Sequence, residues 1–280
     1  MKLLNFIKSN LKELTLLLLP AIICIIVYLT PSSFQNLFVL DLNHLNWFSW
    51  FTYIFLHVDF SHIFNNLLIY ILAIISAYVL TPKEDRKLFV KIFYILIGLI
   101  PLLTLILMIF FRDIGSFPMS LIYNRGFSGI SAGALGILCF AISKHFYLEM
   151  KQEKSFTRLL YCCYYFFIPT LAMMVINLSI IFSIIIWVIW LLIIAFWFFS
   201  KIFYVKKNKV KSNIEKIDIK NLVSPLIIPL IILVYCIQLL VPINVINNGS
   251  AVNTPAHLFG FSIAFIFSLI ISYYFSKVNK

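Results

Sequence analysis

Charged side chains are scarce in this chain. Only 11% of its 280 residues are Asp, Glu, Lys or Arg, whereas soluble domains carry roughly 25%. Hydrophobic residues account for 62% of the sequence. This composition excludes a soluble globular domain and indicates that most of the chain lies in lipid.

Metal-ligand spacing and a signal-peptide cleavage site are also missing. The five cysteines all fall inside apolar runs, where buried, inert thiols are expected. The first apolar run ends at Thr30-Pro31 without a small-residue cleavage site, so we expect it to be a retained span. The sequence therefore predicts no metal, no cofactor and no cleaved leader.

Long apolar runs, in contrast, are abundant. About 20 apolar residues cross the hydrocarbon core. The run 159–204 would form a helix of roughly 70 Å, too long for one crossing, so we divide it at Asn177-Leu178-Ser179. The sequence then predicts an all-α polytopic membrane protein, one domain over 1–280. Its eight spans are at about 14–29, 61–80, 88–110, 128–143, two within 159–204, 222–241 and 255–275.

The formal net charge of +12 follows the predicted topology. If the amino terminus is cytoplasmic, every Lys and Arg except Arg112 and Arg125 falls on the cytoplasmic side, as the positive-inside rule expects. Both termini are then cytoplasmic, as are the basic segments 1–13 and 205–221. We therefore attribute the basic charge to orientation in the membrane and expect no nucleic-acid partner.

Three polar motifs lie near the predicted outer ends of the second, fourth and eighth spans. Polar side chains inside spans are costly and usually face a protected interior, so they are candidate functional residues. On a helix His62 and Asn66 would share one face, about 6 Å apart along the axis. The motifs are His57-x4-His62-x3-Asn66, Gly126-x-Ser128-Gly129 and Ala256-His257-x2-Gly260.

Each motif has a chemical and a purely structural interpretation. A serine beside a histidine can be a nucleophile with its general base, and a second histidine and an amide can stabilise an oxyanion. Alternatively, Ser128 can bond the carbonyl one turn earlier. Gly129 and Gly133 have the small-xxx-small spacing of closely packed helices, and His257 can bond a neighbouring carbonyl. The convergence of three motifs on one membrane face favours a shared site.

The three motifs, in this order and topology, resemble those of the rhomboid intramembrane serine proteases. They cover short parts of three spans, and the Trp-bearing connection 31–51 looks like the half-submerged first loop of that family. The resemblance implies a Ser–His dyad without an acidic third member. Ser128 would attack the scissile carbonyl, and His257 would take its proton and deliver it to the leaving amine.

The resemblance also implies the rest of the site and its partners. The backbone N–H of Ser128, His62 and Asn66 would hold the oxyanion, with His57 in support. The substrate would be a single-pass membrane protein, unwound and cut near its outer end by water entering from outside. The lipid bilayer is the other partner, and the Lys-, Asn-, Ile- and Phe-rich composition suggests a prokaryotic cell membrane.

The resemblance also implies structural roles for three glycines. Gly126 and Gly129 would allow close approach around the nucleophile, and Gly260 would let the eighth span lie against the fourth.

The sequence departs from the family pattern at two points. The family core has six spans, so two more lie here between Ser128 and His257. Because two is an even number, the eighth span keeps the orientation that the histidine requires. Ala132 stands where the family commonly has an aromatic residue that stacks on the histidine, and we expect Phe261 to shield the imidazole instead.

Two other function classes compete with an active protease. A catalytically inactive rhomboid-like protein would bind membrane clients without cutting them, and Ala132 and the extra spans are compatible with it. A transporter or channel would need charges deep in several spans or inverted repeats, and the sequence shows neither.

Overall fold

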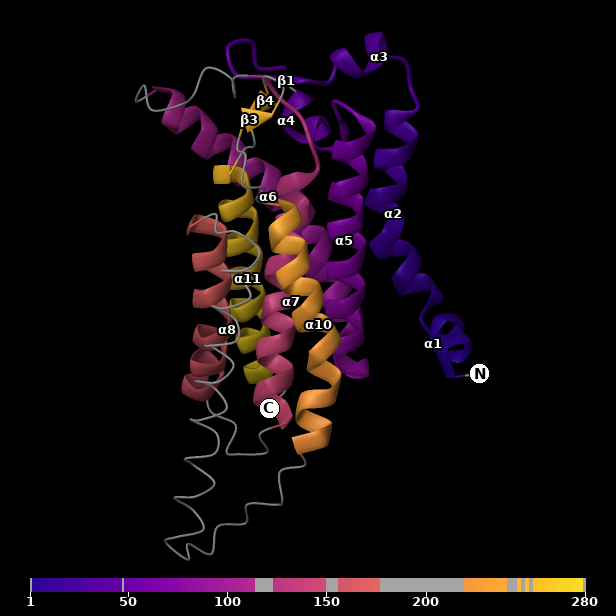
Figure 1. Ribbon diagram of the computed structural model, residues 1–280, viewed down its shortest axis with the longest axis vertical. Coiled ribbons are helices and arrows are strands. Elements are labelled where there is room, and N and C mark those ends of the chain that lie inside the picture. The colour runs from indigo at the N-terminus through magenta and orange to yellow at the C-terminus, as the bar shows by residue number, and fades with distance from the viewer. Residues whose placement is uncertain are drawn as a thin grey trace, which may run out of the picture.

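The computed structural model is built almost entirely from helices (Figure 1). It describes residues 2–46, 48–113, 123–149, 156–176, 219–240, 246–247, 250–251 and 254–278. The helices are α1 (Lys2–Ser9), α2 (Leu11–Tyr28), α3 (Ser32–Asn36), α4 (Ser49–Thr52), α5 (Phe60–Leu80), α6 (Arg86–Asp113), α7 (Ser128–Glu149), α8 (Phe156–Ile176), α10 (Ile219–Leu240) and α11 (Thr254–Val278). Two 3₁₀ turns, η1 (Tyr53–Phe55) and η2 (Lys83–Asp85), and the two-residue strands β1 (Leu40–Asp41), β2 (Tyr123–Asn124), β3 (Ile246–Asn247) and β4 (Ser250–Ala251) complete the set.

Five of these helices, α2, α5, α6, α7 and α11, are long and apolar enough to cross a membrane. Helices α8 and α10 contain shorter apolar stretches, Leu159–Ala172 and Pro225–Leu240. The prediction of an all-α, multi-pass membrane protein is therefore confirmed. The predicted sixth span and the loop 205–218 lie outside the described residues, so the described part of the chain contains five helices that are long and apolar enough to span a membrane.

The helices extend past the apolar runs from which they were predicted. Helix α7 continues to Glu149 although its apolar run ends near Ser143, and Lys144 there pairs with Asp85 at 2.9 Å. The amino-terminal segment 1–13 is divided by Asn10, because α2 already begins at Leu11. Backbone hydrogen bonding continues a helix beyond the hydrocarbon, whereas hydropathy marks only the part in lipid.

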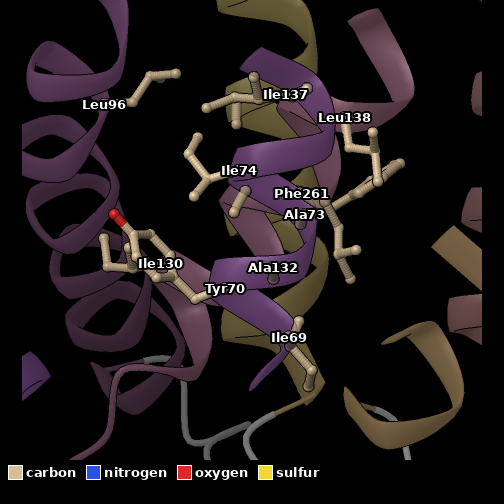
Figure 2. Packing of buried hydrophobic residues seen from close by; sticks show 14 of the residues in the cluster. Ile69, Tyr70, Ala73, Ile74, Leu96, Ile130, Ala132, Ile137, Leu138 and Phe261 are labelled. Carbon is tan, nitrogen blue, oxygen red and sulfur yellow. The ribbon is translucent and has the colours of Figure 1, made fainter. Parts of the chain in front are cut away.

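Helix α7 is the centre of the bundle. It packs against α5, α6, α8, α10 and α11, and 83% of its spanning segment is buried inside the protein, compared with 22% for α2. Figure 2 shows buried side chains around it, including Ile74 of α5, Ile137 of α7 itself and Phe261 of α11. The motif serine therefore begins the most buried of the five candidate spans in the described part of the chain.

Glycine allows α11 to approach α7 at backbone distance. A Cβ on Gly260 would overlap the carbonyl oxygen of Gly129, and a Cβ on Gly136 would overlap that of Phe261. At Gly133 a Cβ would lie 3.5 Å from the carbonyl oxygen of Gly260. Because lipid tails are as apolar as the side chains, such close van der Waals packing drives helices together in a membrane.

The helices that carry the three motifs begin at the same end of the bundle. In Figure 1, α5, α7 and α11 each start at the upper end, near α3, α4 and the short strands, whereas α1 and the end of α11 lie at the lower end. Strand β1 pairs antiparallel with β2, with Leu40 opposite Asn124 and Asp41 opposite Tyr123. This pairing ties the connection between α2 and α5 to the segment that enters α7.

Polar contacts hold α2 to its neighbours at the other end. Arg86 and the hydroxyl of Tyr78 both donate to the side-chain oxygen of Asn10, at 2.8 and 3.0 Å. The Arg86 guanidinium also lies 5.0 Å from the ring centroids of Phe6 and Tyr78. Charge, amide and aromatic rings thus fasten the first span to α5 and α6.

We predict that Gly260→Ala destabilises the protein and that Gly98→Ala does not. The new methyl at 260 meets the backbone of α7, which cannot move aside as a side chain can, and such overpacking costs about 1–3 kcal/mol. At Gly98, in α6, nothing lies within 4 Å of the added methyl, and removal of a helix-interior glycine is favourable by up to about 1 kcal/mol. Thermal unfolding in detergent measures both; equal melting temperatures for the two variants would contradict the close α7–α11 contact.

Candidate functional site

Asp59 sets the start of α5 and thereby the positions of two motif residues. Its backbone is extended, and its side chain accepts a hydrogen bond from the backbone N–H of His62 at 2.8 Å, which is a helix N-cap. His62 consequently lies half-buried in the first turn, and Asn66 lies buried one turn later. The two share a helix, with the spacing of neighbours on one face.

His57 lies just before α5 and is 2% exposed. Its Nε2 is 3.3 Å from the side-chain nitrogen of Asn66 and accepts from the backbone N–H of Phe127 at 3.5 Å. Because these nitrogens carry the protons, Nε2 must be an acceptor, which requires the neutral ring with its proton on Nδ1. The ring meets that of His62 edge to face, with centroids 5.1 Å apart.

Burial keeps this histidine neutral. Loss of water lowers the pKa of His57 to about 3, the neighbouring His62 also lowers it, and the Phe55 backbone and Asp59 oppose both effects. His57 is therefore a hydrogen-bond acceptor at any pH near neutrality.

Gly126 makes the turn that leads into α7. Its φ of +134° is one that side chains rarely adopt, and its N–H donates to the carbonyl of Tyr53 at 3.0 Å. A Cβ at this position would lie 3.0 Å from Cε1 of His62. The absent side chain thus leaves room for the His62 imidazole beside the turn.

Ser128 is the first residue of α7 and is half-buried. The preceding residue, Phe127, is fully buried, with its ring 5.0 Å from that of Tyr70 and 6.3 Å from that of Phe55. An aromatic anchor on one side and a glycine turn before it fix the backbone from which the Ser128 hydroxyl projects.

His257 lies in the first turn of α11, 3% exposed, and its Nδ1 has no hydrogen-bond partner among the described residues. Its neighbour Ala256 has its carbonyl oxygen 3.8 Å from where a Cβ of Gly129 would be. Ser128 and His257 therefore flank the contact between the first turns of α7 and α11. The described residues include no hydrogen bond between them; catalytic hydrogen bonds are often long in free enzymes and shorten when substrate binds.

The predicted site residues thus lie at the starts of three helices, α5, α7 and α11, and in the loop just before α5. His62 lies beside Gly126, and the Ala256 carbonyl lies beside Gly129, so the α5 and α11 motifs both approach the segment that begins α7. Within the described ranges, no three His, Cys, Asp or Glu side chains gather into a metal-binding group. The arrangement offers a hydroxyl, an imidazole and hydrogen-bond donors, the groups used in nucleophilic acyl transfer.

The aromatic residue expected to shield His257 is engaged elsewhere. Phe261 is fully buried and stacks on Phe167 of α8, with centroids 5.5 Å apart and an interplanar angle of 15°. Phe167 also packs on Phe265 at 4.5 Å. Among the ring contacts of the described residues none joins Phe261 to His257, so Phe261 supports α11 against α8.

Sequence reasoning missed Ser131. Its buried hydroxyl lies 2.8 Å from the main-chain oxygen of Asn66 and 3.2 Å from that of Phe127. The available signal was a hydroxyl three residues after Ser128 within a run of small residues, a pattern that equally fits simple helix packing.

We predict that acid destabilises the protein partly through His57. The unfolded chain binds a proton below the ordinary pKa of 6.5, whereas the folded site resists it to about 3. Stability contributed by this neutral ring is complete above pH 6.5 and decreases as pH falls towards 3, by at most about 1.4 kcal/mol per unit. Melting temperatures measured from pH 6.5 down to about 4.5 should fall less steeply in His57→Gln, whose oxygen can still accept. The exposed His44→Gln control should keep the wild-type slope; an unchanged slope in His57→Gln would contradict this role.

Comparison with known proteins adds no relative. The chain matches no protein-family model, no curated protein and no solved structure.

Proposed function

We propose that this chain is a rhomboid-type intramembrane serine protease, which cleaves single-pass membrane proteins near the outer membrane face. The observation that carries the proposal is the backbone contact of the first turn of α7, at Gly129, with α11 at Gly260, one turn after His257, which brings the segments bearing Ser128 and His257 together. The position of His62 beside Gly126 adds further support.

In the proposed reaction, the Ser128 hydroxyl attacks the scissile carbonyl and a neutral His257 imidazole takes its proton. The C–N bond breaks as His257 returns that proton to the departing amine, leaving an acyl-serine. Water then attacks the ester carbonyl and gives a proton to His257. The bond between the carbonyl carbon and the Ser128 oxygen breaks as His257 returns that proton to the serine, which regenerates the free hydroxyl. The half-buried position of Ser128 is compatible with water entry.

The oxyanion formed in each step needs donors of fixed geometry. We assign this role to the backbone N–H of Ser128, to His62 and to the Asn66 side chain. Asn66 has two amide protons, and its nitrogen lies 3.3 Å from His57 Nε2, so one proton can remain for the oxyanion. His57 then acts indirectly, by holding the amide.

The proposed membrane arrangement has a six-helix core and two additional spans, eight in all. The charge bias of the sequence supports cytoplasmic termini, with the site at the outer face of a prokaryotic cell membrane. Helix α8 packs on α7 and α11, whereas α10 packs on α5 and α7, so α8 is our candidate for part of the additional pair.

The second candidate function is a catalytically inactive relative that binds membrane clients. Ala132, which is buried and offers no ring to the imidazole, favours it, as does the absence of a hydrogen bond between Ser128 and His257 in the described residues. The two functions differ in one measurable property, the nucleophilicity of Ser128.

We predict that a fluorophosphonate probe labels Ser128 and that the purified protein in lipid cleaves a single-span substrate. Ser128→Ala and His257→Gln should each reduce cleavage by about 10⁴-fold or more, because members of such a unit act together. Labelling is quantified by mass spectrometry of the modified peptide, and cleavage by gel analysis of the products.

Matched controls separate chemistry from folding. Ser143→Ala removes a buried hydroxyl from the same helix, which donates to the Cys139 carbonyl and contacts Cys163 but touches none of the candidate site residues, and it should keep wild-type rates. Cleavage that persists in both site variants would exclude the dyad. A folded wild type that is neither labelled nor active, yet binds the substrate, would establish the client-binding alternative.

A further inference from the structure

Ser131 differs from the other buried hydroxyl residues of the helices around it. Ser143 and Thr170 donate to carbonyls of their own helices, at 2.8 and 2.7 Å, the usual arrangement of a hydroxyl in an apolar helix. Ser131 makes its shorter contact across to α5, 2.8 Å from the oxygen of Asn66, and its intrahelical contact is 3.2 Å. The stronger hydrogen bond therefore links two helices.

Both main-chain carbonyls that the Ser131 hydroxyl contacts also accept a helical N–H, and each keeps a second lone pair. The Phe127 carbonyl accepts the backbone N–H of Ser131 at 2.9 Å, as the α-helix requires. The second lone pair of the Asn66 carbonyl, which the helix leaves free, is available to the Ser131 hydroxyl. Ser131 is fully buried, so water does not compete for either partner.

These contacts close a ring around the candidate oxyanion site. Ser131 contacts the main chains of Asn66 and Phe127, and both of those residues approach Nε2 of His57, Asn66 through its side chain and Phe127 through its N–H. Asn66 is thereby held at both ends. Phe127 directly precedes Ser128, so the same ring holds the nucleophile's backbone relative to the amide.

We propose that Ser131 is a positioning residue that sets the Asn66 amide at the depth of Ser128. This inference rests on the proposed function. Without the hydroxyl, the starts of α5 and α7 lose their direct hydrogen bond and keep packing and the longer contacts through His57 to define their relative height. A displacement of about 1 Å in such a site can reduce the rate by about 10²-fold.

The test measures kcat, KM and the rate of fluorophosphonate labelling in folded protein, normalised to the titrated active fraction. We expect Ser131→Ala to lower kcat and the labelling rate by about 10- to 100-fold with little change in KM. Ser143→Ala, equally buried on the same helix, should leave all three unchanged.

A second pair of variants isolates the hydroxyl from changes in volume. Thr and Val have the same shape, so Ser131→Thr should react at least about 10-fold faster than Ser131→Val if the hydrogen bond matters. Equal rates for that pair, or wild-type rates in Ser131→Ala, would overturn the positioning role while leaving the protease intact. An unlabelled, inactive wild type would instead overturn the proposed function, and the positioning role with it.

Discussion

The contact between α7 and α11 depends on the missing side chain of Gly260. Two helices that touch through their backbones have one permitted relative height, because a shift of one residue brings a Cβ against a carbonyl. At this contact the second turn of α11, one turn after His257, is fixed against the first turn of α7. The proximity of the segments that carry Ser128 and His257, which are far apart in the chain, follows from this contact.

Hydrogen bonds perform the corresponding task between α5 and α7. Polar groups buried in a membrane protein must find partners within the protein, since lipid offers none. Here Nε2 of His57 accepts from Asn66 and from the Phe127 N–H of the loop that enters α7, and the Ser131 hydroxyl donates to the Asn66 main chain. The cost of leaving any of them unpaired makes the arrangement rigid. Rigidity of this kind is what a preorganised oxyanion site needs.

Helix α8 carries none of the motif residues, yet it packs on two helices that do. It packs against the sides of α7 and α11, and its Phe167 stacks on Phe261 one turn below His257. The motif ends of α7 and α11 remain in contact with each other. Aromatic stacking between α8 and α11 therefore supports the bundle below the candidate site.

Composition and local pattern determined the membrane class, the approximate limits of the described spans and the three motifs. Those features depend on residues close together in the chain: hydropathy over one span, or the four-residue separation of His62 and Asn66. The partners of Ser131, His57 and Phe261 were decided only by the tertiary structure. Each of them contacts a helix or loop that is distant in sequence, and which face meets which depends on where glycine permits backbone approach. The sequence shows the small residues that allow helices to contact one another closely. Which helices do so depends on the packing of all the helices in the bundle.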